Sequence, residues 1–256
     1  MSAGVRRIAV VFFDLGNTLM FYSGDLNDAL SAGARAMGDV LRARGYTLEP
    51  PAMFERTFLE RLHQYYGWRD QVLIEIPTAR LLDEVLRGWG IEAAPAHLSE
   101  ALAAFYAPSE ACWQPDEEAV PTLAHLRRVG YRLGVISNAG DAADVHYLVE
   151  KAGLQPYLDE VIVSAEVGRR KPHPDIFTHA LRCFGVEAAQ AVMVGDLLWA
   201  DVWGAQQVGM RGVWLTRHLA PDVVQVTPVL VQPDARLERL SALPALLAQW
   251  DEDPPA

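Results

Sequence analysis

The sequence predicts an α/β fold in which a doubly wound parallel sheet carries a helical insertion after its first strand. Three observations predict it. Residues 8–13 form a continuous apolar, partly β-branched run, which is typical of a strand covered on both faces. Residues 25–112 show only helical periodicity. After Pro115, strand-like and helix-like segments alternate, as expected for parallel strands that are connected by helices.

The insertion is rich in Ala, Leu, Arg and Glu at helical spacing, and Pro and Gly separate its segments. Its predicted helices cover residues 26–44, 51–66, 78–89 and 97–107. Because no strand alternates with them, they are expected to form a separate helical domain. We therefore expect an α/β domain made of residues 1–20 and 113–256, and a helical domain made of residues 21–112.

The remaining part of the chain supplies the other strands and helices of the α/β domain. The predicted strands are residues 132–137, 160–164, 191–194 and 211–215. The predicted helices are residues 117–129, 142–152, 174–184 and 200–208. Glycine follows several of these helices, as at Gly153 and Gly185, where it can form a left-handed cap. A weak strand is expected near residues 228–231 and a last helix over residues 236–249.

Composition excludes several classes of function. A chain of 256 residues can form one large core or one domain with an insertion. The net charge of −11 argues against binding to nucleic acid. No apolar stretch is long enough to span a membrane, and Asp14 interrupts the short apolar run near the N-terminus, unlike a signal peptide. We expect a cytoplasmic protein without nucleic-acid or membrane partners.

Polar side chains follow the predicted strands. Ligands of open α/β sheets bind beyond the carboxyl ends of the strands. The residues expected at this edge are Asp14, Thr18, Ser137, Asn138, Lys171, Asp196 and Asp201. Carboxylates that converge require a cation, or one of them must be protonated. Hard oxygen ligands beside a phosphate site indicate Mg²⁺.

Four segments in this order resemble the motifs of the haloacid dehalogenase-like hydrolase superfamily, whose members are mostly phosphatases. They are FFDLGNTL, GVISN, RRKPHPDIF and VGDLLWADVWGAQQVGM. The resemblance covers the whole α/β domain and includes a helical cap inserted after the first motif. It implies a Rossmann-like core and a Mg²⁺-dependent phosphatase that hydrolyses a small phosphorylated metabolite through an aspartyl-phosphate.

The resemblance also implies a role for individual residues. Asp14 would be the nucleophile that attacks phosphorus. Thr18, Ser137 and the backbone of Asn138 would form hydrogen bonds with the phosphoryl oxygens. Lys171 would neutralise charge on Asp14 and on the phosphoryl group, which stabilises the transition state electrostatically. Taken alone, the run of basic residues 169–171 is more typical of a solvated surface.

The metal site implied by the resemblance has four members. Asp14 and Asp196 would bind Mg²⁺ directly, and Asp201 would bind it directly or through water. Gly16 would contribute its backbone carbonyl.

Gly16 also departs from the family pattern, and Asn17 stands where the family usually has glycine. Most phosphatases of the family carry a second Asp at position 16, which protonates the leaving alcohol and then activates water. Asn17 cannot replace it, because an amide is no proton donor at a useful pKa. General acid–base catalysis contributes about 10²–10⁴-fold in rate. From the sequence alone we therefore expect a steep dependence of the rate on leaving-group pKa.

Three interpretations of Gly16 remain open. The first is a phosphatase whose acid is missing or comes from elsewhere. The second is a 2-haloacid dehalogenase, a metal-independent branch that also lacks the second Asp; the presence of Asp196 and Asp201 argues against it. The third is a catalytically weak or inactive protein with a binding or regulatory role, which the otherwise complete set of motif residues disfavours.

The helical insertion contains the segment RLHQYYGWRDQ at residues 61–71. Its aromatic residues could stack on a ring, and Arg61 or Arg69 could bind a second phosphate or a carboxylate. Helix packing and a solvated face explain the same residues equally well. The sequence leaves both interpretations open.

Overall fold

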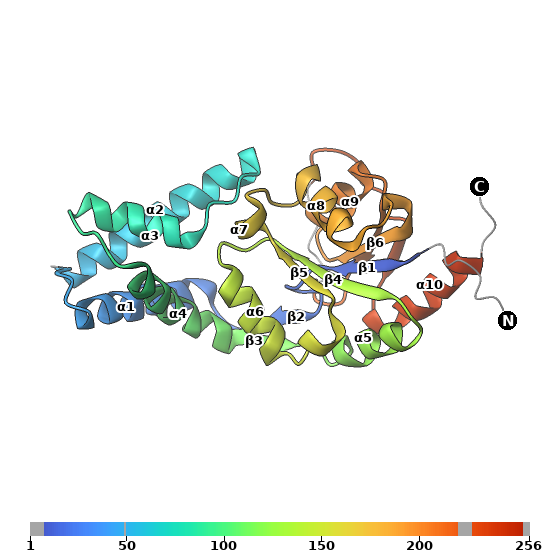
Figure 1. Cartoon of the computed structure of the whole chain (residues 1–256), viewed down its shortest axis with the longest axis horizontal. Coiled ribbons are helices and arrows are strands. Elements are labelled where there is room, and N and C mark those ends of the chain that lie inside the picture. The colour runs from blue at the N-terminus through green and yellow to red at the C-terminus, as the bar shows by residue number, and fades with distance from the viewer. Residues whose placement is uncertain (1–7, 49, 220–226, 253–256) are drawn as a thin grey trace.

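The computed structural model describes residues 8–48, 50–219 and 227–252. Within this part of the chain, the main sheet has six parallel strands in the order β5-β4-β1-β6-β7-β8 (Figure 1). The strands are β1 (Val10–Phe13), β4 (Arg132–Ser137), β5 (Glu160–Val163), β6 (Ala191–Gly195), β7 (Arg211–Leu215) and β8 (Ala235–Leu237). The parallel sheet confirms the predicted fold class, and β1 occupies its centre.

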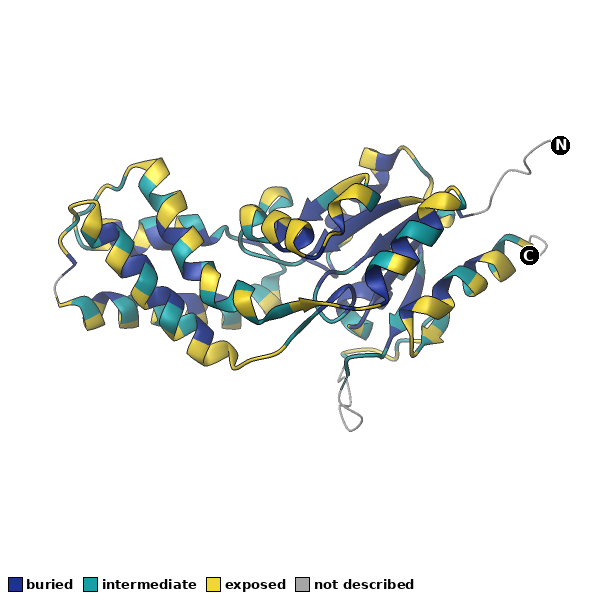
Figure 2. Cartoon of the chain, turned by 90° about the horizontal axis from the view of Figure 1, so that it is seen from below, coloured by how far each residue is buried: buried dark blue, intermediate teal, exposed yellow. Residues whose placement is uncertain are grey.

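Helices cover both faces of this sheet, so its central strands are buried (Figures 1 and 2). On one face lie α5 (Ala119–Arg128), α6 (Ala142–Lys151) and α10 (Leu243–Glu252), and on the other lie α8 (Pro174–Phe184) and α9 (Gly204–Gln207). The side chains of β1 alternate between these faces. Val11 and Phe13 belong to one hydrophobic cluster, whereas Val10 and Phe12 belong to the other. Burial of each such side chain stabilises the fold by about 1.5–3 kcal/mol.

Four helices form the insertion at the opposite end of the molecule from α10 (Figure 1). They are α1 (Leu26–Ala43), α2 (Pro51–Val72), α3 (Thr78–Gly88) and α4 (Pro95–Cys112). They share a hydrophobic core of their own, with Met37, Phe58 and Phe105 among its buried residues. The helix α1 begins at Asp25, whose carboxylate accepts hydrogen bonds from the next backbone amides.

Two short strands connect the insertion to the sheet. β2 (Met20–Tyr22) and β3 (Trp113–Pro115) pair in antiparallel orientation and place Tyr22 opposite Trp113. The sequence analysis did not predict them, because three residues are too few to show the alternation that marks a strand. The pair fixes where the chain leaves the sheet and where it returns.

The last part of the chain differs from the prediction. Residues 228–231 are not a strand; the edge strand is β8, and the final helix begins only at Leu243. β8 forms because it pairs with β7, a tertiary contact that local sequence does not reveal. The predicted helix at 200–208 is divided into the π-helix η3 (Leu198–Trp203) and α9. Among the described helices, none is both long and apolar enough to cross a membrane.

The shorter elements fill the connections. They are η1 (Gln155–Tyr157), α7 (Ser164–Val167), η2 (Ala188–Gln190) and η4 (Leu240–Ala242). The connection from α7 to α8 contains Lys171 and passes close to the insertion, since the backbone of Ile74 pairs with that of Arg169.

Candidate active site

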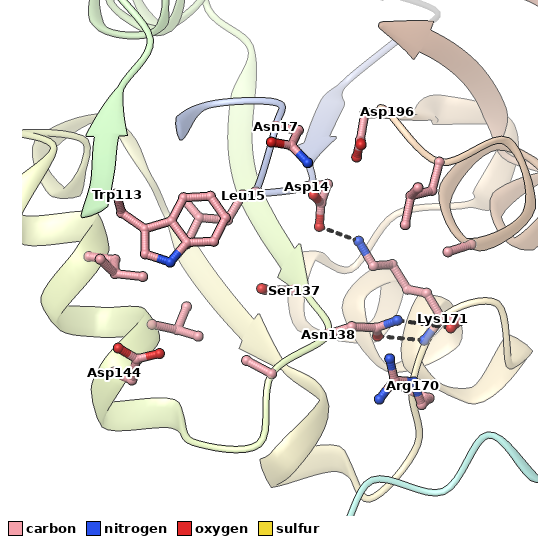
Figure 3. Close-up of a pocket in the computed structure, with 16 residues that line it drawn as sticks. Asp14, Leu15, Asn17, Trp113, Ser137, Asn138, Asp144, Arg170, Lys171 and Asp196 are labelled. Carbon is pink, nitrogen blue, oxygen red and sulfur yellow. Dashed lines mark hydrogen bonds and ion pairs between the residues drawn. The ribbon is translucent and has the colours of Figure 1, made fainter. Parts of the chain in front are cut away.

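The register of the sheet brings three strand ends to one edge. Phe13 of β1 lies opposite Val135 of β4 and Val194 of β6. The residues that follow these strands therefore meet, and a cavity of about 310 Å³ lies there (Figure 3). Among the residues that line it are Asp14, Gly16, Ser137, Asn138, Lys171 and Asp196.

Lys171 lies at the centre of the polar contacts in this site. Its Nζ donates hydrogen bonds to Asp14 Oδ1 at 2.6 Å and to Asp201 Oδ1 at 2.7 Å. Burial lowers the pKa of Lys171, but the two carboxylates outweigh it and raise this pKa above its ordinary value. The side chain of Asn138 holds the Lys171 backbone at both ends: its Oδ1 accepts from the Lys171 amide at 2.7 Å, and its Nδ2 donates to the Lys171 carbonyl at 2.9 Å.

Asp201 is fully buried on η3, behind the cavity. Its Oδ2 accepts a hydrogen bond from the Leu197 amide at 3.0 Å. This position requires glycine at residue 195, because a Cβ there would lie 2.2 Å from Asp201 Oδ2. Glycine at residue 195 therefore allows the Asp201 carboxylate to lie close to the backbone.

The three acidic side chains form a compact cluster. Carboxylate oxygens of Asp14, Asp196 and Asp201 all lie within 4.8 Å of one another. Burial, together with the charge of Asp201, raises the pKa of Asp14 to about 6 although Lys171 opposes the shift. Burial and the charges of Asp14 and Asp201 raise the pKa of Asp196 to about 8. The raised pKa values show that Lys171 does not fully compensate the charges of the three acidic groups, and such hard oxygen ligands fit Mg²⁺.

Thr18 is placed differently from its neighbours in the first motif. It is fully buried, does not line the cavity, and its Oγ1 has no hydrogen-bond partner among the described residues. Asn17 lines the cavity in its place and adopts the left-handed conformation, with φ of 53°. The structure therefore brings the other predicted residues together but leaves Thr18 beneath the site.

Arg170 also lines the cavity, and the sequence analysis missed it because basic runs are usually solvated. It is buried, and its Nη1 donates to Glu75 Oε2 at 3.0 Å. Glu75 comes from the insertion and is itself buried; its carboxylate also accepts hydrogen bonds from Ser164 and Tyr65. This network attaches the insertion to the segment that contains Lys171.

Gly16 faces the indole ring of Trp113. A Cβ at residue 16 would lie 3.0 Å from Cη2 of that ring, a contact that requires the ring to shift. The φ of Gly16 is outside the left-handed region, so the ring, rather than the backbone conformation, restricts a side chain there. The place where the family's acid would begin is thus adjacent to an apolar ring that lines the cavity.

A second cavity of about 370 Å³ extends from the first toward the insertion. Trp113, Asn138, Ala139 and Asp144 line both cavities. Of the candidate residues in segment 61–71, Tyr66 and Arg69 line the second cavity.

The other members of that segment have packing or surface roles. Arg61 forms an ion pair with Glu84 at 2.8 Å, and Tyr65 is buried against Glu75. Trp68 is 42% exposed. Packing therefore explains Tyr65, whereas Tyr66 and Arg69 are available to a ligand.

Comparison with known proteins identifies the family. The sequence model of the haloacid dehalogenase-like hydrolases matches residues 8–209, which include the cavity-lining residues described above. The chain belongs to this family. It is therefore a hydrolase, as the motifs predicted.

Relatives within the family have different activities. A glyceraldehyde 3-phosphate phosphatase from Methanopyrus kandleri is 34% identical over 84% of this chain and 87% of its own. The structure of a phosphatase of the family from Thermococcus onnurineus matches with a TM-score of 0.59 at 25% identity, covering 94% of this chain and 98% of its own. A 2-haloacid dehalogenase from Pseudomonas syringae matches with a TM-score of 0.68 at 29% identity, covering 95% and 99%. The chemistry of the site must therefore distinguish between the two reactions.

Proposed function

We propose that this hydrolase is a Mg²⁺-dependent phosphatase that acts on a small phosphorylated metabolite. The observation that carries the proposal is the buried cluster of Asp14, Asp196 and Asp201 around Lys171. A cluster with excess negative charge suits a site that binds a divalent cation together with a phosphate group. Phosphatases among the relatives support the same reaction.

In this proposal Asp14 attacks phosphorus, the bond from phosphorus to the ester oxygen breaks, and an aspartyl-phosphate forms on Asp14. Water then hydrolyses the aspartyl-phosphate and releases inorganic phosphate. Lys171 compensates charge on Asp14 and on the phosphoryl oxygens, while the Ser137 hydroxyl and the Asn138 backbone hold those oxygens. Asn138 has a further role, because its side chain fixes the Lys171 backbone.

Asp14, Asp196, Asp201 and the carbonyl of Gly16 would hold the Mg²⁺ ion. When bound, the ion would neutralise charge on the phosphoryl group. The residues fit this ion because their carboxylate oxygens are already gathered within 4.8 Å.

We further propose that residues 21–112 are a cap whose border with the α/β domain runs through the β2–β3 pair. The second cavity, which joins the first at Trp113, Asn138, Ala139 and Asp144, would then accept the non-phosphate part of the substrate. Tyr66 and Arg69 of the cap face this part. Apolar and aromatic side chains form most of the lining of this cavity, and Arg69, Ser109 and Asp144 add polar groups that could bind substrate hydroxyls.

The test is a panel of phosphate monoesters assayed for phosphate release with Mg²⁺ and with a chelator. The proposal predicts release that depends on Mg²⁺ and is lost in chelator. 2-Chloropropionate serves as the opposing substrate. Chloride release in chelator, with no phosphate release from any ester, would establish the dehalogenase activity instead.

A further inference from the structure

Asp144 of α6 is a further acidic group at the catalytic cavity, in addition to Asp14 and Asp196, and the mechanism above does not use it. It lines the cavity that contains Asp14 and also the cavity that reaches the cap. In Figure 3 its carboxyl group lies on the far side of Ser137 from Asp14. Its Oδ1 is buried and has no hydrogen-bond partner among the described residues.

The carboxyl group of Asp144 is paired with that of Glu110, at the end of α4. Two carboxyl groups can share a hydrogen bond only if one of them keeps a proton. Burial raises the pKa of Asp144 to about 8, and the charges of Glu110 and Asp141 add to this effect. Burial also raises the pKa of Glu110, although Lys151 opposes it.

The surroundings of the pair do not supply a cation to Asp144. Lys151 directs its Nζ to the backbone carbonyls of Glu110 and Trp113, the latter at 3.0 Å. Tyr106 of α4, whose pKa burial raises well above its ordinary value, lines the second cavity together with Asp144, and its hydroxyl forms a hydrogen bond with Thr78 Oγ1 at 2.7 Å. Asp144 therefore holds a proton at neutral pH, beside the space where a substrate would lie.

We propose that Asp144 is the general acid of this enzyme and replaces the Asp that the family usually carries at position 16. The proposal rests on the phosphatase function proposed above. The phosphoryl group binds between Asp14 and Ser137, so an in-line leaving oxygen points away from Asp14 and toward the side of the cavity that contains Asp144.

In the first step, Asp14 bonds to phosphorus and the bond to the ester oxygen breaks. The departing oxygen takes the proton of Asp144, directly or through one water, and leaves as the alcohol. Asp144 is now a carboxylate. Water enters where the alcohol left and attacks phosphorus of the aspartyl-phosphate. It gives a proton back to Asp144 as the bond between phosphorus and the Asp14 oxygen breaks, which releases inorganic phosphate and the Asp14 carboxylate. The net reaction is hydrolysis of one phosphate ester, and the acid is restored.

Glu110 is the positioning residue for this acid. It belongs to the cap, whereas Asp144 belongs to the α/β domain, so the pair forms only when the two domains are packed together. The proposal reverses the expectation from sequence alone: the rate of the wild-type enzyme should depend weakly on leaving-group pKa, because the proton is supplied.

The central test compares glycerol 3-phosphate, an alkyl ester, with 4-nitrophenyl phosphate, whose phenolate leaves without a proton. In Asp144→Asn we expect the first turnover of glycerol 3-phosphate to slow by about 10²-fold or more. The first-turnover release of nitrophenolate should be unchanged. Later turnovers of both esters should slow, and phosphoenzyme should accumulate, because no base activates the water. Asp39→Asn, an exposed carboxylate on α1, is the matched control.

A stability measurement shows whether Asp144 carries the proton, whatever the activity. In the folded protein its pKa is raised from 3.8 to about 8, so only the unfolded chain is ionised between these values. Its contribution to stability therefore falls as pH rises through this window. Asp144→Asn should raise Tm at neutral pH and flatten the decline of Tm between acid and neutral pH. An unchanged pH profile would show that Asp144 is ionised when folded and would overturn the proposal.

Glu110→Gln provides the second variant. Removal of its charge should move the alkaline limb of the glycerol 3-phosphate rate to lower pH and leave nitrophenolate release unaffected. Equal losses on both esters in Asp144→Asn would instead assign Asp144 to substrate binding and overturn the proposal. Unchanged first turnovers on both esters would overturn it as well. If the wild-type enzyme releases phosphate from neither ester, the phosphatase function is wrong. The stability measurement then still shows whether Asp144 is protonated in the folded protein.

Discussion

The two sides of the catalytic cavity are built in different ways. On the Asp14 side, the polar groups come from the α/β domain, and Lys171 links Asp14 to Asp201 through bonds of 2.6 and 2.7 Å. On the opposite side, the helical insertion also contributes: Trp113 directly follows its last helix α4, and Asp144 interacts with Glu110 of α4. On the Asp14 side, hydrogen bonds within one domain hold the charged groups in place. The opposite side depends on how the helical insertion packs against the α/β domain.

The largest effect should follow from removal of the nucleophile. Asp14→Asn is nearly isosteric but far less nucleophilic, so turnover of any phosphate ester should fall by more than about 10³-fold. Steady-state phosphate release measures it, and circular dichroism confirms the fold. Asp175→Asn, an exposed carboxylate in the first turn of α8, is the control. Activity within about tenfold of wild type would remove Asp14 from this role.

The metal side of the site should respond next. Chelation should abolish phosphate release, and Mg²⁺ should restore it. Asp196→Ala should weaken Mg²⁺ binding, measured by calorimetry, because it removes one of three gathered carboxylates. Ca²⁺ should inhibit, since its higher and looser coordination disturbs an octahedral site. Activity that survives chelation would show that the Asp14 side of the cavity does not need a metal ion, and would contradict the proposed role of Asp196 as a Mg²⁺ ligand.

The connection between the two domains should be visible in stability. Glu75→Gln removes a buried charge that pairs with Arg170 at 3.0 Å, and should lower the free energy of unfolding by about 3 kcal/mol. Urea denaturation measures it. The control is Glu84→Gln, a partly exposed partner of Arg61, which should cost about 0–1 kcal/mol. Similar small losses of unfolding free energy in both variants would show that Glu75 does not stabilise the contact between the helical insertion and the α/β domain.

The smallest effect concerns the contact between Gly16 and Trp113. A Cβ at residue 16 lies 3.0 Å from the ring, so Gly16→Ala should destabilise the protein by about 1 kcal/mol. The same substitution in a Trp113→Ala background should cost nothing further, and the difference is read from thermal unfolding of the four proteins. Gly16→Asp should give no selective gain on glycerol 3-phosphate, because Asp144 already supplies the proton. Additive losses would show that the ring does not restrict residue 16.

The sequence predicted what depends on local pattern. The strand Arg211–Leu215 and the helix Pro174–Phe184 have the predicted bounds, because a buried run and a Pro-to-Gly segment mark their ends. Asp14 and Asp196 could be proposed as site residues because each follows an apolar strand. The carboxyl ends of parallel strands meet, so these positions require no knowledge of distant packing.

What the sequence did not predict depends on packing between distant segments. From the sequence Arg170 resembles a surface residue, because its buried partner Glu75 comes from the helical insertion, which is distant in the sequence. The strand β8 exists through its pairing with β7. Asp144 is an ordinary acidic residue near the start of a helix in the sequence, and its pKa is raised by its burial and by the approach of Glu110 and Asp141 in the fold. Thr18 follows Asp14 in the same motif, but the fold buries it beneath the cavity lining, and its contact with the phosphoryl group stays a prediction.

Direct detection of the aspartyl-phosphate tests the central claim most directly. Enzyme mixed with 4-nitrophenyl phosphate and Mg²⁺ is quenched in acid within the first turnover, treated with borohydride, and analysed by peptide mass spectrometry. Borohydride reduces an acyl phosphate of aspartate to homoserine. We predict homoserine at residue 14, and at no other acidic residue, only when the ester is present. Phosphate release without conversion of Asp14 would contradict the proposed mechanism.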